Sequence, residues 1–305
     1  MQSGAADSPR APGLTSECCS FRGSQPFRWE LSRFCFSFST LRLNNCKISS
    51  GSSNADKPNF FIEGGIHSRE WISPATVIYM TGQMLSQYKT NKTFSEFVDK
   101  FNWYIVPVVN VDGYVFTWTT DRKWRKTRSK NKDSKCIGVD PNRNWDVHWC
   151  EAGASKDPCS DSYCGPSAFS ESEVKGVADF VQKVGMKGFI DFHSFSQLWM
   201  SPWGYTKKLP DDYKAQIKGS ELAVKALESV HGTKYQYGTI ANIIYVASGS
   251  SADWTYGEAK VKYSYGVELR DTGKHGFILP PEQIIPSGEE TLAALIALAN
   301  YVYDN

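Results

Sequence analysis

The chain has 305 residues, a formal net charge of +2 and an apolar fraction of 41%. This length and composition suffice for one domain with a sizeable buried core. The near-neutral charge gives no reason to expect a nucleic-acid partner. No apolar stretch approaches the roughly 20 residues that span a bilayer, so we expect no membrane partner either.

Residues 1–46 differ from the rest of the chain. They mix Ser, Arg, Cys and Phe without a period of two or 3.6 residues, which predicts a poorly ordered leader or at most an edge strand. Leu41 to Ile48 has alternating apolar positions that could pair as a strand. No apolar segment typical of a signal peptide follows Met1. We expect the ordered domain to occupy residues 47–305.

Strand and helix patterns alternate along this domain. Phe60 to Glu63 predicts a buried strand, and Ser73-Pro74 begins a helix that runs to about Tyr88, because Pro is favoured at the first helical position. The remaining predicted elements are a strand-length apolar run from Trp103 to Val109 that ends at Asn110-Val111-Asp112-Gly113, a helix from the capping box Ser170/Glu173 to about Gly185, a strand from Gly188 to Phe192, a helix from about Pro210 to Gly232, a strand from Tyr263 to Leu269, and a helix capped by Ser287 and Glu290. This alternation predicts a single α/β domain whose mixed, largely parallel central sheet carries helices on both faces.

The cysteines form two groups. The first is Cys18, Cys19, Cys35 and Cys46, and the second is Cys136, Cys150, Cys159 and Cys164, in a loop rich in Asn, Asp, Ser, Gly and Pro. The second group contains no Cys-x-x-Cys pair, which favours disulfides over a zinc knuckle. Disulfides indicate an oxidising compartment. Asn91-Lys92-Thr93 is a glycosylation sequon, a pattern too common to decide whether it is used.

Three residues that can bind a metal follow predicted strands. His67 and Glu70 come after one strand, and His193 comes after another. Sheets of this kind carry their sites in loops beyond the carboxyl ends of the strands. Two His and one carboxylate leave the fourth position of a tetrahedral zinc open, as a catalytic site requires. A lone histidine at a strand end is more often a hydrogen-bonded core residue, so these residues alone leave the two interpretations about even.

The surrounding motifs decide between the two. They are Gly65-Ile66-His67-Ser68-Arg69-Glu70-Trp71, Trp124-Arg125-Lys126-Thr127-Arg128, Asp140-Pro141-Asn142-Arg143-Asn144-Trp145, His193-Ser194-Phe195-Ser196-Gln197, Ile244-Tyr245 and Glu268-Leu269-Arg270-Asp271. In these motifs, from about Lys47 to the C-terminus, the sequence resembles the pancreatic-type zinc metallocarboxypeptidases of the A/B group. The resemblance implies the zinc carboxypeptidase fold and a monomeric, extracellular exopeptidase that acts on peptide or protein C-termini. It also implies that the first strands of the family's catalytic domain are missing from residues 47–305.

The resemblance assigns a role to each matching residue. The implied metal ligands are His67, Glu70 and His193, which would hold one Zn²⁺. Glu268 would take a proton from water and return it to the leaving amine, while Arg125 would stabilise the developing oxyanion. The remaining assignments concern the substrate: Asn142 and Arg143 grip its terminal carboxylate, Tyr245 closes over it, and Arg69 contacts the upstream residue. The resemblance further pairs Cys136 with Cys159 and Cys150 with Cys164.

Specificity in this family depends on the residue two positions before a tryptophan at the base of the pocket. An acidic residue there selects Lys and Arg, whereas an aliphatic one selects apolar side chains. Here that position is Ala252, and the other positions of the pocket wall are Gly204, Ile240, Ile244, Ala247 and Gly266. None is charged and several are small, so we expect a roomy, apolar pocket that prefers large apolar or aromatic C-terminal residues. Asp253 lies beside the pocket in the family's pattern and is not the selector.

Two functional interpretations compete. An active carboxypeptidase is favoured because all of the chemical residues are present. The alternative is a non-catalytic protein that binds zinc or peptides on the same scaffold, suggested by residues 1–46, where the family's N-terminal pattern is not recognisable. A serine hydrolase around Ser248-Gly249-Ser250-Ser251 is excluded because the segment lacks a Gly-x-Ser-x-Gly elbow.

Overall fold

A computed structural model describes residues 46–49 and 57–305 of the chain. Within them, a seven-stranded sheet has the order β1-β3-β2-β4-β7-β5-β6. The strands are β1 Cys46–Ile48, β2 Asn59–Gly64, β3 Asn102–Val106, β4 Gly188–Ser194, β5 Leu198–Ser201, β6 Gln236–Thr239 and β7 Tyr263–Leu269. The neighbouring pairs β2–β3, β2–β4, β4–β7 and β5–β6 are parallel, while β1–β3 and β5–β7 are antiparallel. The predicted mixed, largely parallel sheet is therefore confirmed.

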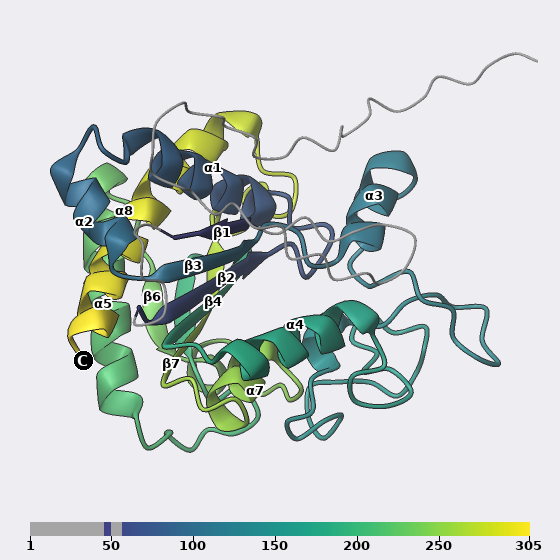
Figure 1. The fold of residues 1–305 in the computed structure, drawn as a ribbon. Helices are drawn as coiled ribbons and strands as arrows, with labels where there is room; N and C mark the ends of the chain where they lie inside the picture. The colour runs from purple at the N-terminus through teal and green to yellow at the C-terminus, as the bar shows by residue number, and fades with distance from the viewer. Residues whose placement is uncertain (1–45, 50–56) are drawn as a thin grey trace, which may run out of the picture.

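Helices cover both faces of the sheet (Figure 1). One layer consists of α1 Ile72–Gln87, α2 Lys92–Asp99, α5 Tyr213–His231 and α8 Ile284–Asp304, and the other of α4 Ser172–Val184 and α7 Ser251–Gly257. The remaining helical elements are α3 Val111–Thr119, α6 Ile240–Ile243, and the 3-10 turns η1 Pro141–Arg143 and η2 Pro281–Gln283. In Figure 1, α3 stands apart from both layers.

Each face of the sheet has its own apolar core, because successive strand residues point to opposite faces. On β2, Phe60 and Ile62 pack with residues of α1, α2, α5 and α8 such as Leu295. Phe61, between them, packs on the other face with α4 residues such as Val177. A strand buried on both faces needs apolar side chains in both registers, which explains the uninterrupted apolar pattern of residues 60–62.

Several predicted boundaries were wrong. The strand predicted from Trp103 to Val109 ends at Val106. The segment after it begins α3, where the Asn110 side chain accepts a hydrogen bond from the Gly113 backbone N–H (3.0 Å). Asn is favoured both in loops and at helix N-caps because its side-chain oxygen accepts from nearby backbone N–H groups, so the residue alone does not show that a helix begins here.

The two predicted capping boxes are also corrected. The helix α4 begins at Ser172, and the Ser170 hydroxyl donates instead to the Glu171 carboxylate (3.1 Å). The helix α8 begins at Ile284, so Ser287 lies inside it. The predicted ends of the helices at Gly185 and Gly232 are correct, and both glycines have the positive φ that favours this residue at a helix terminus.

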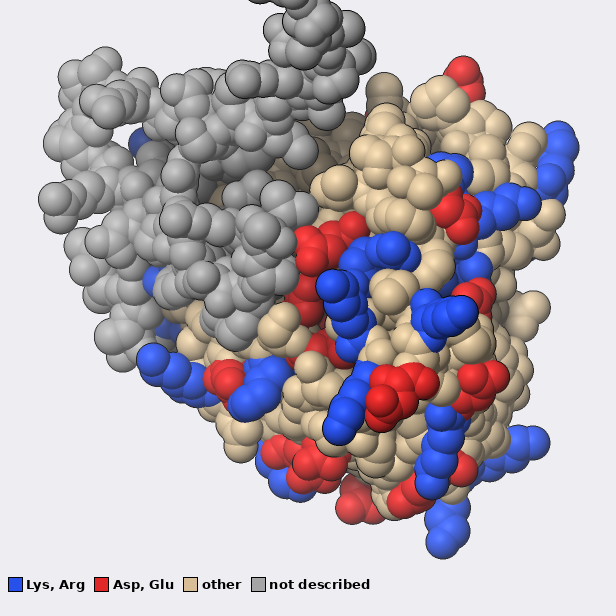
Figure 2. Space-filling view, turned by 90° about the vertical axis from the view of Figure 1, so that its right-hand side faces the viewer, with Lys and Arg blue, Asp and Glu red and all other residues tan. Residues whose placement is uncertain are grey.

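Both disulfides implied by the resemblance are present. The Cα atoms of Cys136 and Cys159 are 5.1 Å apart, and those of Cys150 and Cys164 are 5.7 Å apart. The predicted leader lies outside the described residues up to residue 45; Cys46–Ile48 forms β1, which pairs with β3. The described helices include none that is long and apolar enough to cross a membrane. Positive and negative side chains are interspersed over the visible part of the face in Figure 2.

Candidate active site

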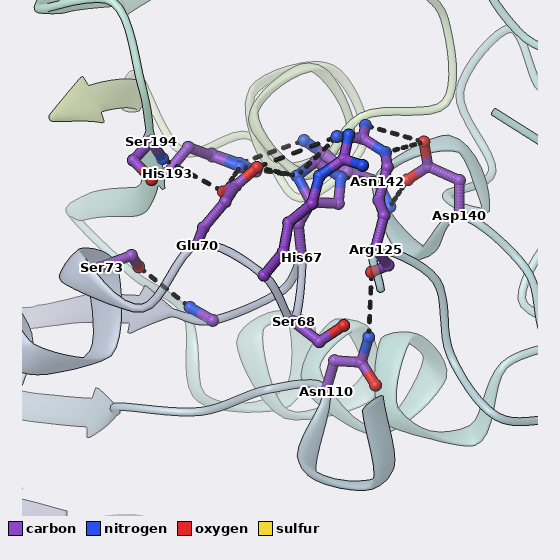
Figure 3. A network of polar contacts seen from close by, with 12 residues as sticks. His67, Ser68, Glu70, Ser73, Asn110, Arg125, Asp140, Asn142, His193 and Ser194 are labelled. Carbon is purple, nitrogen blue, oxygen red and sulfur yellow. Dashed lines mark hydrogen bonds and ion pairs between the residues drawn. The ribbon is translucent and has the colours of Figure 1, made fainter. Parts of the chain in front are cut away.

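The three predicted metal ligands lie at the carboxyl ends of two neighbouring parallel strands. The strand β2 ends at Gly64, and Gly65 turns the chain with a φ of 62°, a conformation that glycine adopts without strain. This turn leads directly to His67 and Glu70. His193 occupies the end of β4, which pairs with β2. Figure 3 shows the three side chains pointing toward one another.

The geometry of this cluster fits a zinc ion. The Glu70 carboxylate places one oxygen 2.9 Å from His67 Nδ1 and the other 3.1 Å from His193 Nδ1, and these two nitrogens are 3.1 Å apart. Donor atoms around a tetrahedral zinc with bonds of about 2.0–2.1 Å are roughly 3.3 Å apart. All three residues are buried. Two imidazoles and one carboxylate therefore offer a compact donor set with room for a further ligand.

A carboxylate lies behind each imidazole. His67 Nε2 is 3.1 Å from Asp140 Oδ1, and His193 Nε2 is 2.8 Å from Asp191 Oδ2, which also accepts from the Ser251 hydroxyl (2.6 Å). Such contacts place the ring proton on Nε2 and leave Nδ1 free for a metal. Sequence reasoning gave no role to either carboxylate. The signal for Asp191 was its position two residues before His193, since strand residues i and i+2 share a face.

The charges of the cluster favour a cation. Burial alone would raise the pKa of Glu70, but the adjacent His67 and His193 outweigh it and hold that pKa below its usual range. Burial would likewise lower the pKa of His193, but the carboxylates of Asp191 and Glu70 hold it well above its ordinary value. The negative charges that favour a proton on His193 would also attract a metal ion.

Glu268 lies beside this cluster on β7, in register with His193 on β4. Its Oε2 atom is buried and has no hydrogen-bond partner in the described part of the chain. Burial, followed by repulsion from Glu70, raises the pKa of Glu268 to about 8. A carboxyl group with a pKa near neutrality and an unpartnered oxygen is suited to exchange protons.

Arg125 borders the cluster beside its partner Asp140 and contacts both Asp140 and His67. Its Nη2 and Nε atoms donate to Asp140 Oδ2 (2.8 and 3.1 Å), and its Nη1 atom is 3.2 Å from His67 Nδ1 (Figure 3). Burial opposes the charge of Arg125, but Asp140 and Glu70 outweigh burial and raise its pKa above the ordinary value. Asn110, which sequence reasoning missed, fixes this segment by donating to the Lys126 carbonyl (3.0 Å).

Arg143 presents a buried positive charge. Its side chain donates to the carbonyls of Gly153 (2.9 Å) and Asn142 (2.8 Å) and to the Tyr245 hydroxyl (3.3 Å), and none of these described partners is a carboxylate. Only 5% of Arg143 is exposed, whereas Tyr245 is 52% exposed. Asn142 is fixed by the Ser251 backbone N–H, which donates to its side-chain oxygen (2.8 Å).

Most of the predicted site residues line one pocket that opens to solvent. It is lined by His67, Arg125, Asn142, Arg143, His193, Met200, Ile240, Ile244, Tyr245, Ala247, Ser250, Ser251, Ala252, Gly266 and Glu268. Glu70 lies behind the two histidines, and Arg69 lies outside the pocket with its guanidinium 4.3 Å from the Phe277 ring centre. Gly204, predicted in the wall, is not a lining residue. Met200 lines the pocket without having been predicted.

Comparison with known proteins places the chain in a family. The sequence model of the zinc carboxypeptidase family matches residues 15–294. This chain belongs to that family. It is thus a metallocarboxypeptidase by family, and the match begins within the segment that the sequence analysis set apart as a leader.

Individual relatives agree with this placement. Carboxypeptidase B of Astacus astacus is 50% identical over 83% of this chain and 84% of its own length. Carboxypeptidase A2 of Mus musculus is 45% identical over 88% of this chain, which spans only 64% of the length of that relative. The structure of bovine thrombin-activatable fibrinolysis inhibitor, solved with tick carboxypeptidase inhibitor, has a TM-score of 0.83 and 38% identity over 92% of this chain and 91% of that one. Relatives of both A and B types are present, so overall similarity does not decide specificity.

Proposed function

We propose that this chain is an active zinc-dependent exopeptidase that removes the C-terminal residue of peptides and proteins. The observation that carries the proposal is the buried Arg143 guanidinium, which lacks a carboxylate partner among the described residues and lines the same pocket as His67 and His193. A buried unpaired charge is costly. The terminal carboxylate of a substrate would supply the missing anion, and guanidinium binds carboxylate through two parallel hydrogen bonds.

With the substrate's terminal carboxylate held at Arg143, the groups that react with the scissile bond can be assigned. Zinc, when bound by His67, Glu70 and His193, supplies a Lewis acid that lowers the pKa of water and polarises a carbonyl. Glu268 accepts a proton from water at its unpartnered Oε2 atom and delivers it to the leaving amine, a role that typically contributes 10²–10⁴-fold in rate. Arg125 donates to the oxyanion that develops on the scissile carbonyl, and one such donor is worth roughly 3–4 kcal/mol.

The pocket lining supports a preference for large apolar or aromatic C-terminal residues. At the selecting position, Ala252 is small and uncharged, and a side chain built on Gly266 would meet no atom within 4 Å, so this part of the pocket is open. The Asp253 carboxylate accepts from the backbone N–H groups of Gly204 and Tyr205 (2.8–2.9 Å) and does not line the pocket. Burying a ring is worth about 1.5–3 kcal/mol, whereas an unpaired ammonium group there is penalised by more than that.

The two disulfides support an extracellular location, because disulfides persist in oxidising compartments, and the resemblance to the pancreatic-type carboxypeptidases supports the same location. We propose a monomer whose partners are peptide or protein C-termini.

The preference is tested with hippuryl-Phe and hippuryl-Arg, each with and without a chelator. We expect hippuryl-Phe to be cleaved faster, and the chelator to abolish both reactions. Ala252→Asp places a carboxylate in the pocket and should shift the preference toward Arg, while Ala252→Val is the matched uncharged control. Faster cleavage of hippuryl-Arg by the wild-type protein would show that the pocket is assigned wrongly. No cleavage of either substrate by the zinc-loaded protein would favour the non-catalytic alternative.

A further inference from the structure

The loop that carries His67 and Glu70 is called the zinc-ligand loop below. A pair of stacked tryptophans lies next to this loop but outside the pocket. Trp71 directly follows Glu70, and its ring stacks on that of Trp118 from α3, with the ring centres 4.1 Å apart and the planes 19° from parallel. The Trp71 indole N–H donates to the Thr117 hydroxyl (2.9 Å), which fixes the ring against α3. We call Trp71 and Trp118 the tryptophan pair.

Within the pair, Trp71 is held in place by Arg122. The Arg122 guanidinium lies 3.8 Å from the Trp71 ring centre, and its two terminal nitrogens donate to the carbonyls of Arg69 (2.8 Å) and Phe277 (2.6 Å). These two hydrogen bonds fix the guanidinium plane, so its stacking on Trp71 is preorganised. Arg69 in turn covers the Phe277 ring (4.3 Å). The tryptophan pair is therefore continuous with the residues bordering the zinc-ligand loop.

Trp118 is nevertheless open to solvent. It is 62% exposed, the highest fraction among the large hydrophobic side chains of the described residues. The rigid body of a tryptophan offers a large contact area at little conformational cost, which is why exposed tryptophans are enriched at binding surfaces. A fixed ring that is exposed beside a reaction site provides a stacking surface for another aromatic group.

We propose that the tryptophan pair binds an aromatic side chain of the peptide substrate, several residues before the scissile bond. The inference rests on the proposed function, which fixes the C-terminal residue at Arg143 and assigns Arg69 to the upstream residue. Because Arg122 donates to the Arg69 carbonyl and stacks on Trp71, an upstream chain that reaches Arg69 is directed toward the tryptophan pair. Aromatic stacking of this kind corresponds to roughly a 2- to 10-fold change in kcat/KM. A blocked dipeptide is too short to extend past this loop, so its cleavage does not depend on Trp118.

The test uses the full chain loaded with zinc and a set of eight-residue peptides that end in Phe. One Trp is moved through the upstream positions of an otherwise Ala- and Ser-based sequence, with hippuryl-Phe as the short substrate. We expect wild-type kcat/KM to rise about 2- to 10-fold when the Trp reaches one upstream position. Trp118→Ala should abolish this rise through a higher KM, Trp118→Phe should retain part of it, and hippuryl-Phe should be cleaved equally by all three proteins.

Ile78→Ala is the matched control, because Ile78 is 57% exposed on α1 and should leave every substrate unaffected. A wild-type protein with no upstream aromatic preference, or a Trp118→Ala protein that keeps it, overturns the inference. Equal loss of long- and short-substrate cleavage in Trp118→Ala also overturns it, since the ring would then only support the zinc-ligand loop. A wild-type protein that cleaves neither substrate removes the proposed function, and this inference with it.

Discussion

On β4 and β7, the two faces of the sheet differ near the carboxyl ends of the strands. Phe192 and Val267 are apolar on the face covered by α1, α2, α5 and α8, whereas the alternating positions on the face covered by α4 and α7 are charged or metal-binding. Phe192 and Val267 belong to the first face and its apolar core. Asp191, His193 and Glu268 alternate with them on the same strands and point to the other face. Nearer the amino end of β4 both faces are apolar, with Ile190 in the first core and Phe189 in the second.

Within a single strand, residues on one face therefore contribute mainly to the stability of the fold, and residues on the other face to metal binding and catalysis. Apolar positions on the first face stabilise the domain by burial. On the second face, buried charges oppose folding unless they are paired, and each is paired or shifted in pKa. A substitution on one face should therefore change stability, and its neighbour on the other face should change metal binding or rate.

The largest effect is expected for Glu268→Gln. The amide cannot accept a proton from water at neutral pH, so we expect a loss of about 10²–10⁴-fold in kcat. Zinc content and the free energy of unfolding should be little changed, because Gln matches Glu in size and the raised pKa of Glu268 already keeps much of its charge out of the interior near neutral pH. The measurements are kcat on hippuryl-Phe, metal analysis and denaturant unfolding. Near-wild-type kcat with unchanged zinc would remove Glu268 from the mechanism.

The next prediction concerns substitutions of two neighbouring residues on β4. Phe192→Ala should lower the free energy of unfolding by about 3–5 kcal/mol, because Phe192 is fully buried on the apolar face. The folded fraction should keep its zinc affinity. Asp191→Asn weakens the partner of His193 Nε2 and should reduce zinc affinity about 10- to 100-fold with a smaller stability change. If both substitutions changed stability and zinc affinity to the same extent, the two faces would not be independent.

A smaller effect concerns pH. Burial raises the pKa of Asp253 to about 6 from an unfolded value near 3.8. Because the folded state holds the proton more tightly, the stabilisation is present below pH 4 and is lost as the pH rises to 6. The wild-type protein should therefore lose up to about 3 kcal/mol relative to Asp253→Asn across this range. Unfolding free energies of both proteins at several pH values, with chelator present throughout, measure the difference. A constant difference contradicts the raised pKa.

Much of this arrangement was predictable from the sequence. Buried strands such as Phe60 to Glu63, and histidines at strand ends, follow from periodicity and from the rule that sites lie beyond carboxyl ends. The disulfide pairing and the role proposed for Arg143 came from the resemblance, since spacing alone leaves several pairings open. The helix that begins after Asn110 was not predicted, because the same side chain can lie in a loop or cap a helix. The contact between Asp140 and His67 joins distant segments and leaves no periodic signal.

The central claim is that the zinc cluster and Arg143 act together on a free C-terminus. Mass spectrometry of one peptide ending in Phe, prepared with a free carboxylate and with a C-terminal amide, tests this directly. The zinc-loaded protein should remove a single Phe from the free acid and leave the amide intact, and chelation should stop the reaction until zinc is restored. Equal cleavage of both peptides, or cleavage of the free acid that persists in chelator, would contradict the account.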